Sequence, residues 1–419
     1  MERGIIKHLI TQHAEECAFL WLMRDNAVRA PHYAVLDVTK SDSRIEAHID
    51  GLRIAGDAGW RACKEALSLA GPGEVFAASL LAFESGDKNR IDDVLACGTT
   101  SYELTRGTIS ALGWISFPRA QPLLNYLIAS QPPMFRRIGI AGYAAHREDP
   151  GQALKAASSD TDAPLKARAL KAIGELGRRE LLPALQAHLR SEDGEVLSQE
   201  AWSAALLGNG IRVPALRKLF QSGGMYAERA CAMALRRINL CDAHEWQREL
   251  AGLPESQRLS VQAAGVIGDP VLIPWLIDRM ATPLVARVAG EAFTMITGVD
   301  LAYPDLEGEW PEGFQAGPTE NPNDENVERD SDEDLPWPNP ELIEKWWAKH
   351  RNEFQTGVRH LLGKPITEAW MWEVLKIGKQ RQRAAAALEL AMLQPGRPLF
   401  NVKAPAWRQM GLIASRKTS

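Results

Sequence analysis

The feature that most constrains the fold is a helix pair at residues 162–190, because the middle of the chain repeats it. Gly174 and Gly177 come near the end of its first helix, where close packing or a left-handed cap residue favours glycine. Pro183 falls in the first turn of the second helix, where its missing N–H costs nothing. Such a pair buries its apolar face only against copies of itself. In the first helix that face is one stripe at helical spacing: Leu165, Ala169, Leu170, Ile173 and Leu176.

The copies follow in register with Gly174. The successive steps are 29, 32, 34, 28, 32 and 29 residues, and prolines follow most of them. The equivalent positions are Gly113, Gly142, Gly174, Gly208, Arg236, Gly268 and Thr297. The pattern resembles the HEAT repeat in its acidic residue, the pair Leu165-Lys166, its alanines and its Leu-Gly end. It differs in a slightly short period and in Arg236, which stands where the other repeats have glycine. This resemblance implies an all-α fold, an α-solenoid of stacked helix pairs.

Four segments are predicted. They are a helical cap region (1–73), the HEAT-like solenoid (74–299), an acidic Pro/Gly-rich loop or linker (300–340) and a Trp-rich helical C-terminal domain (341–419). In the first segment we expect a helix over 5–23, a loop over 29–43 and a second helix over 43–56.

The C-terminal segment has its own helix signals. Asn339-Pro340-Glu341 is typical of a helix start, with a capping residue, proline at the first position and an acid in the first turn. Further helices are expected over 370–376 and 380–393. Basic residues crowd near the middle of this segment, and we interpret them as a solvated helix end, with phosphate binding as the alternative: Lys376, Lys379, Arg381 and Arg383.

Charge is distributed unevenly. Residues 300–340 contain thirteen acidic residues against Arg329 alone, a charge of −12. Because the whole chain carries −5, the remainder carries about +7. The segment is a solvated spacer or an acidic docking strand.

Composition excludes several classes of protein. With 45% hydrophobic and 24% charged residues, the chain resembles a soluble globular protein, and no run is long enough to span a bilayer. No signal-peptide core precedes the repeats, and the five cysteines lack CxxC spacing, so we expect reduced thiols in a cytoplasmic protein. No nucleotide-binding, hydrolase or metal-ligand motif occurs. We therefore predict no enzyme, cofactor or metal site.

Segments outside the repeats carry a second resemblance. QHAEECAFLW (12–21), RIEAHIDGLRIAG (44–56) with GW (59–60), LPWPNP (335–340) and GKQRQRAAAALELAML (378–393) are similar to an uncharacterised bacterial family of HEAT-like proteins. Members of that family are often encoded beside type VI secretion genes, and some act as immunity partners of secreted toxins. The resemblance implies a protein partner; periodicity by itself indicates only a solenoid.

The leading hypothesis is a non-enzymatic protein-binding solenoid that neutralises a secreted toxin effector. The acidic candidates would meet a basic partner or fold back on the basic second helices: Asp324, Glu325, Asp330, Asp332, Glu333 and Asp334. The candidates on the second helices are Arg190, Arg217, Lys218, Trp275 and Arg279.

Two alternatives stay open. One is a DNA-binding protein similar to the HEAT-fold alkylpurine DNA glycosylases, which need a basic face with an aromatic residue and an aspartate. Arg190, Arg212, Arg217, Lys218 and Arg279, with Trp275 and Asp278, would supply it. We predict no specific duplex binding, because the net charge is negative. The other is a secretion scaffold or adaptor; neither the partner's identity nor the oligomeric state follows from the sequence.

Overall fold

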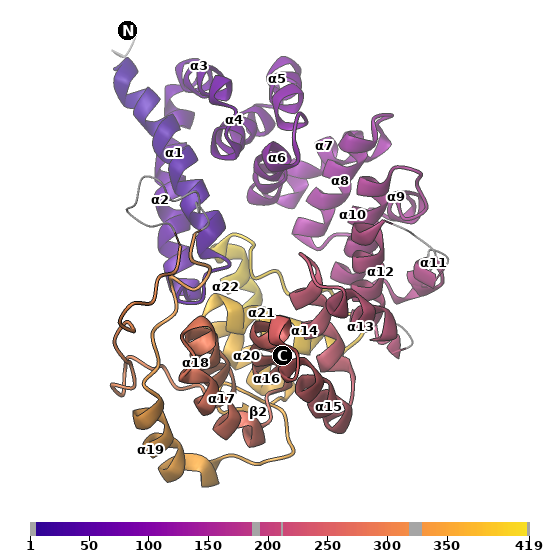
Figure 1. Ribbon diagram of the computed structural model, residues 1–419. Coiled ribbons are helices and arrows are strands. Elements are labelled where there is room, and N and C mark those ends of the chain that lie inside the picture. The colour runs from indigo at the N-terminus through magenta and orange to yellow at the C-terminus, as the bar shows by residue number, and fades with distance from the viewer. Residues whose placement is uncertain (1–5, 187–192, 211–212, 318–328, 417–419) are drawn as a thin grey trace. The chain divides into compact units, whose positions relative to one another are not determined.

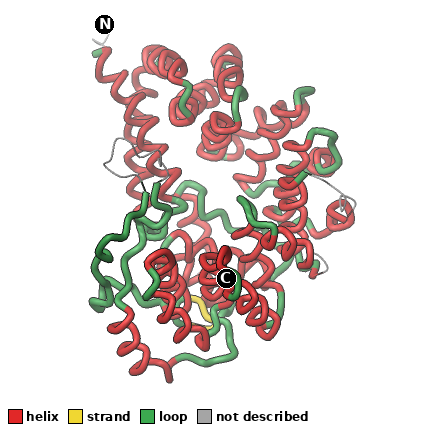
Figure 2. Tube along the Cα trace, in the orientation of Figure 1, coloured by secondary structure: helices red, strands yellow, loops and turns green. Residues whose placement is uncertain are grey.

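The computed structural model describes residues 6–186, 193–210, 213–317 and 329–416. The chain divides into two compact units, residues 1–207 with 394–419 (unit 1) and residues 208–393 (unit 2). Figure 2 shows that nearly all of the regular structure is helical. The C-terminal segment predicted as one domain, 341–419, is therefore shared between the two units. The predicted four-part organisation stays a prediction.

Unit 1 is built of stacked helix pairs (Figure 1). The first helix of each pair packs on the first helix of the next, giving the row α4, α6, α8, α10 and α12. The helices are α1 (Lys7–Ala27), α2 (Val35–Ala55), α3 (Asp57–Ala66), α4 (Pro72–Ser85), α5 (Lys88–Gly98), α6 (Tyr102–Trp114), α7 (Phe117–Ala129), α8 (Pro133–His146), α9 (Gln152–Ala157), α10 (Ala163–Glu175), α11 (Leu182–Gln186), α12 (Gly194–Leu206) and α22 (Ala406–Ser415).

Two roles were predicted for the glycines of the repeat that begins at Asp162, close packing and a left-handed helix cap. Gly174 has the first role and Gly177 the second. Gly174 lies inside α10, and a Cβ there would come within 2.5 Å of Ser203 Oγ on α12. Gly177 follows the helix with φ 72°, the left-handed conformation that glycine adopts without strain. Leu170 and Ile173 are fully buried, so the predicted stripe faces the core.

Unit 2 continues the pattern. Its first helices α14, α16 and α18 form a row, and α13, α15 and α17 pack beside them. The helices are α13 (Val213–Gln221), α14 (Ala227–Arg237), α15 (Leu240–Ala251), α16 (Gln257–Ile267), α17 (Ile273–Met280), α18 (Pro283–Thr297), α19 (Pro340–His350), α20 (Glu368–Ile377) and α21 (Gln380–Leu393). A two-stranded antiparallel hairpin, β1 (His360–Leu361) with β2 (Lys364–Pro365), was not predicted. The all-α solenoid is confirmed.

In unit 1 a C-terminal return segment, residues 396–408, runs past the ends of the first helices. The Leu399 N–H donates to Glu175 O at the end of α10 (2.9 Å). The Asn401 side-chain amide donates to Ala145 O in α8 (3.1 Å). Carbonyls in the last turn of a helix have no partner within it. The return segment therefore satisfies groups that the repeats leave open.

Unit 2 has an equivalent return segment, residues 357–363. The His360 N–H donates to Gly268 O, and the Leu362 N–H donates to Met295 O, each at 2.8 Å. Gly268 has φ 71°, and a Cβ there would lie 2.4 Å from His360 O. The glycine is required both as a helix cap and for the close approach of this segment.

The repeat without glycine ends differently. The Arg236 side chain of α14 is buried and forms an ion pair with Glu389 of α21 (2.9 Å). Ile238 follows the helix in an extended conformation instead of a left-handed one. The Arg359 guanidinium donates to Leu235 O (2.7 Å) and Ile238 O (2.8 Å). Side chains from outside the repeats, Glu389 of α21 and Arg359 of the return segment, thus replace the missing glycine cap.

Two local predictions were wrong. The loop predicted over 29–43 ends early, because α2 begins at Val35, where the Asp37 carboxylate accepts the Ala34 N–H (3.0 Å). The basic residues near 380 are not all solvated: Arg383 is fully buried and donates to Leu375 O at the end of α20 (2.7 Å). Burial lowers the pKa of Arg383 to about 10. The predicted start of α19 is confirmed, since the Asn339 side chain accepts the Leu342 N–H.

Candidate protein-binding site

The acidic segment that follows α18 pairs with itself near its two ends. The Gly308 N–H donates to Trp337 O (2.7 Å), and the Asn339 N–H donates to Leu306 O (2.8 Å). Glu307 and Pro338 form an antiparallel bridge between these bonds. In its described parts the segment is therefore a loop closed at its base, directly before α19.

Two ion pairs fix the second half of the loop to the row of first helices. Asp330 accepts two hydrogen bonds from the Arg287 guanidinium of α18 (2.7 and 2.9 Å). Asp332, which is 5% exposed, accepts two from Arg258 of α16 (both 2.7 Å). Bidentate arginine–carboxylate pairs are strong and set orientation as well as energy. The two aspartates thus hold the loop in place and do not face solvent.

The same arginine also holds the aromatic residues of the loop. The Arg287 guanidinium lies over the rings of Trp337 (4.8 Å) and Trp310 (5.4 Å). Trp310 and Trp337 pack edge to face, and the Trp310 indole N–H donates to Phe314 O (2.7 Å). Arg287 is only 4% exposed, so this contact is desolvated. Both halves of the loop are attached to α18 through one side chain.

These contacts shift the pKa values of Asp330 and Arg258. Burial raises the pKa of Asp330, but the hydrogen bonds and charge of Arg287 outweigh it, so the pKa lies below its usual value. Hydrogen bonding to Asp332 raises the pKa of Arg258. The charged forms of Asp330 and Arg258 are therefore favoured at neutral pH.

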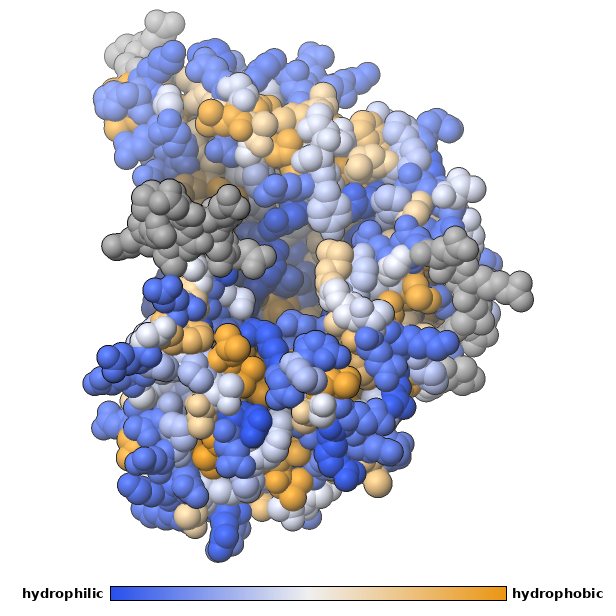
Figure 3. Space-filling model, in the orientation of Figure 1, coloured by the Kyte–Doolittle hydropathy of each residue, from blue (hydrophilic) through white to orange (hydrophobic). Residues whose placement is uncertain are grey.

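The outer side of the loop combines aromatic rings with carboxylates. Tyr303 is 92% exposed and Trp310 is 51% exposed. The acidic neighbours in the same stretch are also exposed: Asp300, Asp305, Glu307, Glu309 and Glu312. We call these seven residues the acidic-aromatic surface. On the face of the molecule drawn in Figure 3, apolar side chains form patches among hydrophilic ones.

The predicted acidic candidates lie in different surroundings in the structure. Asp324 and Glu325 lie outside the described residues. Glu333 and Asp334 are exposed, and Glu333 pairs loosely with Arg329 (3.5 Å). Of the two alternatives for this strand, folding back on the second helices does not describe Asp330 and Asp332, because their partners are on the first helices α18 and α16.

The basic candidates do not assemble into one patch among the described residues. Arg190 and Arg212 lie outside those residues. Arg217 of α13 pairs with Glu249 and lies over the Trp246 ring (4.5 Å). Lys218 and Asp278 are exposed, whereas Arg279 lies over the half-buried Trp275 ring of α17 (5.7 Å). The aromatic candidate of the glycosylase alternative, Trp275, therefore already has an arginine over one side of its ring.

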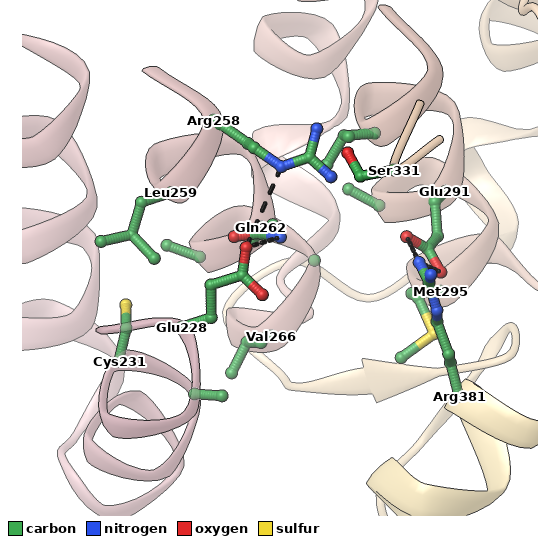
Figure 4. A pocket seen from close by; sticks show the side chains of 15 residues that line it. Glu228, Cys231, Arg258, Leu259, Gln262, Val266, Glu291, Met295, Ser331 and Arg381 are labelled. Atoms are coloured by element: carbon green, nitrogen blue, oxygen red, sulfur yellow. Dashed lines mark hydrogen bonds and ion pairs between the residues drawn. The ribbon is translucent and has the colours of Figure 1, made fainter. Parts of the chain in front are cut away.

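A cavity that the sequence did not predict lies on the row of first helices in unit 2 (Figure 4). Its volume is about 480 Å³, within the range of about 300–1,000 Å³ of small-ligand pockets. α14, α16 and α18 supply most of its wall, while Ser331 and Arg381 complete it. Gly265 brings α16 and α18 close, since a Cβ there would lie 3.0 Å from Ala292 Cα.

A periodic signal for this surface was present in the sequence. Arg258 and Arg287 are 29 residues apart, the same as the step from Gly268 to Thr297, so they occupy one repeat position. Positions that recur with the repeat line one face of a solenoid. The exposed Tyr303 and the ring of Trp310 had no such signal, because the loop lies outside the repeats.

The thiol that lines the cavity is not activated as a nucleophile. Cys231 lines it, but burial raises the pKa of this thiol to about 12, so it stays protonated and a poor nucleophile. Within the described ranges, no group of three or more His, Cys, Asp or Glu side chains is placed to hold a metal ion. The prediction that the chain is not an enzyme stays a prediction. The helices of the described parts include none long and apolar enough to cross a membrane.

Comparison with known proteins agrees with the repeat pattern. A family model described as HEAT repeats matches residues 151–236, which include the helix pair from which the register was read. No curated protein matches the chain. The protein is therefore an all-α solenoid with HEAT-like repeats, a helical scaffold of the type used to bind other proteins.

Proposed function

We propose that this chain is a non-catalytic binding protein that captures a basic protein partner through the acidic-aromatic surface. The observation that carries the proposal is the exposure of Tyr303 and Trp310 among carboxylates, on a loop that Arg258 and Arg287 fix to the solenoid. Tyrosine and tryptophan are enriched among the residues that dominate binding energy at protein interfaces.

Three physical properties favour this role. The loop is already closed by backbone hydrogen bonds and ion pairs, so binding costs less conformational entropy than ordering a free strand. Its exposed carboxylates attract a basic surface and accelerate encounter. The two aromatic rings then provide apolar area that excludes water from the contact.

We propose further that the partner is a secreted toxin and that the chain acts as its immunity protein in the cytoplasm. The resemblance to HEAT-like proteins encoded beside type VI secretion genes supports this choice of partner. A nuclease toxin fits the chemistry, because a site that receives phosphates is basic and would accept an acidic loop. A secretion scaffold or adaptor would use the solenoid without needing such a loop.

The test is co-expression with the product of the neighbouring reading frame. The chain should restore growth of cells that produce this toxin, and the purified proteins should co-elute. Tyr303→Ala combined with Trp310→Ala should weaken binding at least tenfold, since each truncation removes roughly 1–2 kcal/mol of interface energy. Tyr126→Ala, which truncates a tyrosine 54% exposed on α7, is the matched control. Equal affinity of both variants and the parent would contradict the proposed surface.

A further inference from the structure

Two half-buried histidines face each other across α1 and α2, which pack together at the start of unit 1. His13 Nδ1 of α1 lies 3.1 Å from His48 Nδ1 of α2, and the two rings are inclined at 65°. A nitrogen that accepts a hydrogen bond carries no proton, so at most one proton lies between the two Nδ1 atoms. At least one ring therefore presents a lone pair on Nδ1, and neutral imidazole is the form that binds metal ions.

The distances match those of two imidazoles on one metal ion. Zn–N bonds of about 2.0–2.1 Å at a tetrahedral angle place the two nitrogens about 3.3 Å apart. The two Nδ1 atoms therefore need to separate by only about 0.2 Å to hold such an ion. With each nitrogen about 1.15 Å from its ring centroid, the two centroids on the ion lie about 5.2 Å apart. The centroids of His13 and His48 are 5.2 Å apart.

A glycine on α2 makes room for the first ring. Gly51 lies one turn after His48, and a Cβ at Gly51 would come within 2.8 Å of the His13 ring. Without this Cβ, the ring lies against α2 with Nδ1 toward His48. Glu16 and Arg44 also act on His48, and the carboxylate has the larger effect, which favours a cation at this position.

The pair left no motif in the sequence, because its two members are 35 residues apart on different helices. Within the described part of the chain, neither Nε2 atom has a protein partner, and no third His, Cys, Asp or Glu completes a set of three ligands. Because both rings are only half buried, an ion and its water ligands can reach them.

We propose that His13 and His48 bind a divalent transition-metal ion of the Zn²⁺ type through their Nδ1 atoms. The ion would join α1 to α2, and water would occupy the positions that no protein ligand fills. Imidazole ligands suit Zn²⁺, Cu²⁺ and Ni²⁺, whereas Mg²⁺ and Ca²⁺ prefer oxygen ligands. This metal site is independent of the acidic-aromatic surface and of the capture role.

The experiment is a calorimetric titration of ZnCl₂ into the metal-free full chain at neutral pH. The parent should bind Zn²⁺ saturably, excess Mg²⁺ should not displace it, and Cu²⁺ should bind more tightly. His13→Ala and His48→Ala should each weaken Zn²⁺ binding at least tenfold, a difference of about 1.4 kcal/mol. His8→Ala, which removes an exposed histidine of α1 outside the pair, is the matched control and should leave the affinity unchanged.

Electron paramagnetic resonance of bound Cu²⁺ identifies the ligands. The parent should show hyperfine coupling to two imidazole nitrogens, and each alanine variant of the pair should show coupling to one. Gly51→Ala should also weaken Zn²⁺ binding, because the added methyl group displaces the His13 ring. This variant should keep its fold, since alanine favours a helix more than glycine does. Circular dichroism checks the fold of every variant.

Three results would each overturn the metal site: no saturable binding of Zn²⁺ to the parent, equal affinity of His48→Ala and the parent, or coupling of Cu²⁺ to a single nitrogen. The pair would then be a hydrogen bond only. Equal affinity of Gly51→Ala and the parent would overturn the role of Gly51 in positioning His13. None of these results bears on capture of the partner, which is tested separately at Tyr303 and Trp310.

Discussion

Replacing Asp330 by asparagine should destabilise unit 2, because it removes the charge that neutralises a buried arginine. Arg287 is 4% exposed, and both of its contacts with the Asp330 carboxylate are shorter than 3 Å. Removing one partner of a buried ion pair costs about 3–5 kcal/mol. Arg287 keeps its bond to Asp332 O (2.9 Å) and its contact with the indole rings, so we expect the lower end, about 3 kcal/mol.

The assay is thermal unfolding followed by circular dichroism. For a unit of this size, about 1 kcal/mol shifts Tm by roughly 2–4 °C, so Asp330→Asn should lower the transition by about 6–12 °C. Glu333→Gln is the control, since Glu333 is half exposed and its pair with Arg329 is at the surface. Its Tm should change by no more than about 1–2 °C. A shift that small for Asp330→Asn would refute the view that this pair holds the loop.

Three further perturbations test other parts of the structure. Ile173→Asp places a carboxylate at a fully buried position and should abolish the cooperative unfolding transition of unit 1. The control Ile173→Val should lower the stability by only about 1 kcal/mol. A Tm of Ile173→Asp within a few degrees of the parent would show that Ile173 is not in the core. Gly298→Ala should lower the free energy of unfolding in urea more than Gly313→Ala does. Both glycines have φ near 75°, but only at Gly298 would a Cβ meet a backbone atom, Leu362 C at 2.8 Å. Equal losses of stability would show that the return segment moves aside without cost. Burial, with a contribution from the charge of Arg408, lowers the pKa of His146 from 6.5 to about 4, so the unfolded chain binds more protons between these values. The stability that neutral His146 contributes is therefore present above pH 6.5 and lost as pH falls through 4. His146→Gln should reduce the dependence of the free energy of unfolding on pH over that window, measured by urea unfolding. An unchanged dependence on pH would contradict the burial of this ring.

Local periodicity made most of the helices predictable. The glycine register located the first helices because each repeat needs the same close packing or cap at its end, as Gly174 and Gly177 show. The start of α2 was missed because its cap is the side chain of Asp37, three residues inside the helix, instead of a residue before it. The return segments were not predictable. Their contacts join residues as far apart as Arg147 and Leu399, and the backbone carbonyl that accepts from Arg147 leaves no mark on the sequence.

Of the candidate protein-binding site, the sequence predicted only the negative charge of the acidic segment. Composition identified the acidic segment, but an aspartate that will meet Arg287 looks the same in sequence as one that will meet solvent. The distinction depends on where α16 and α18 place their arginines, which is a tertiary property. The cavity residues Glu228, Gln262 and Glu291 come from three repeats, so they form a site only after the repeats have stacked.

The most direct test of the capture role is the association rate of the chain with the product of the neighbouring reading frame, measured at low and moderate salt. The variant should replace only exposed carboxylates of the acidic-aromatic surface, Glu307, Glu309 and Glu312, by serine, because Asp330 and Asp332 hold the loop itself. We predict an association rate about tenfold lower than that of the parent at low salt, a smaller difference at moderate salt and a nearly unchanged dissociation rate. Equal association rates at both salt concentrations would contradict the central claim that this surface captures a basic partner.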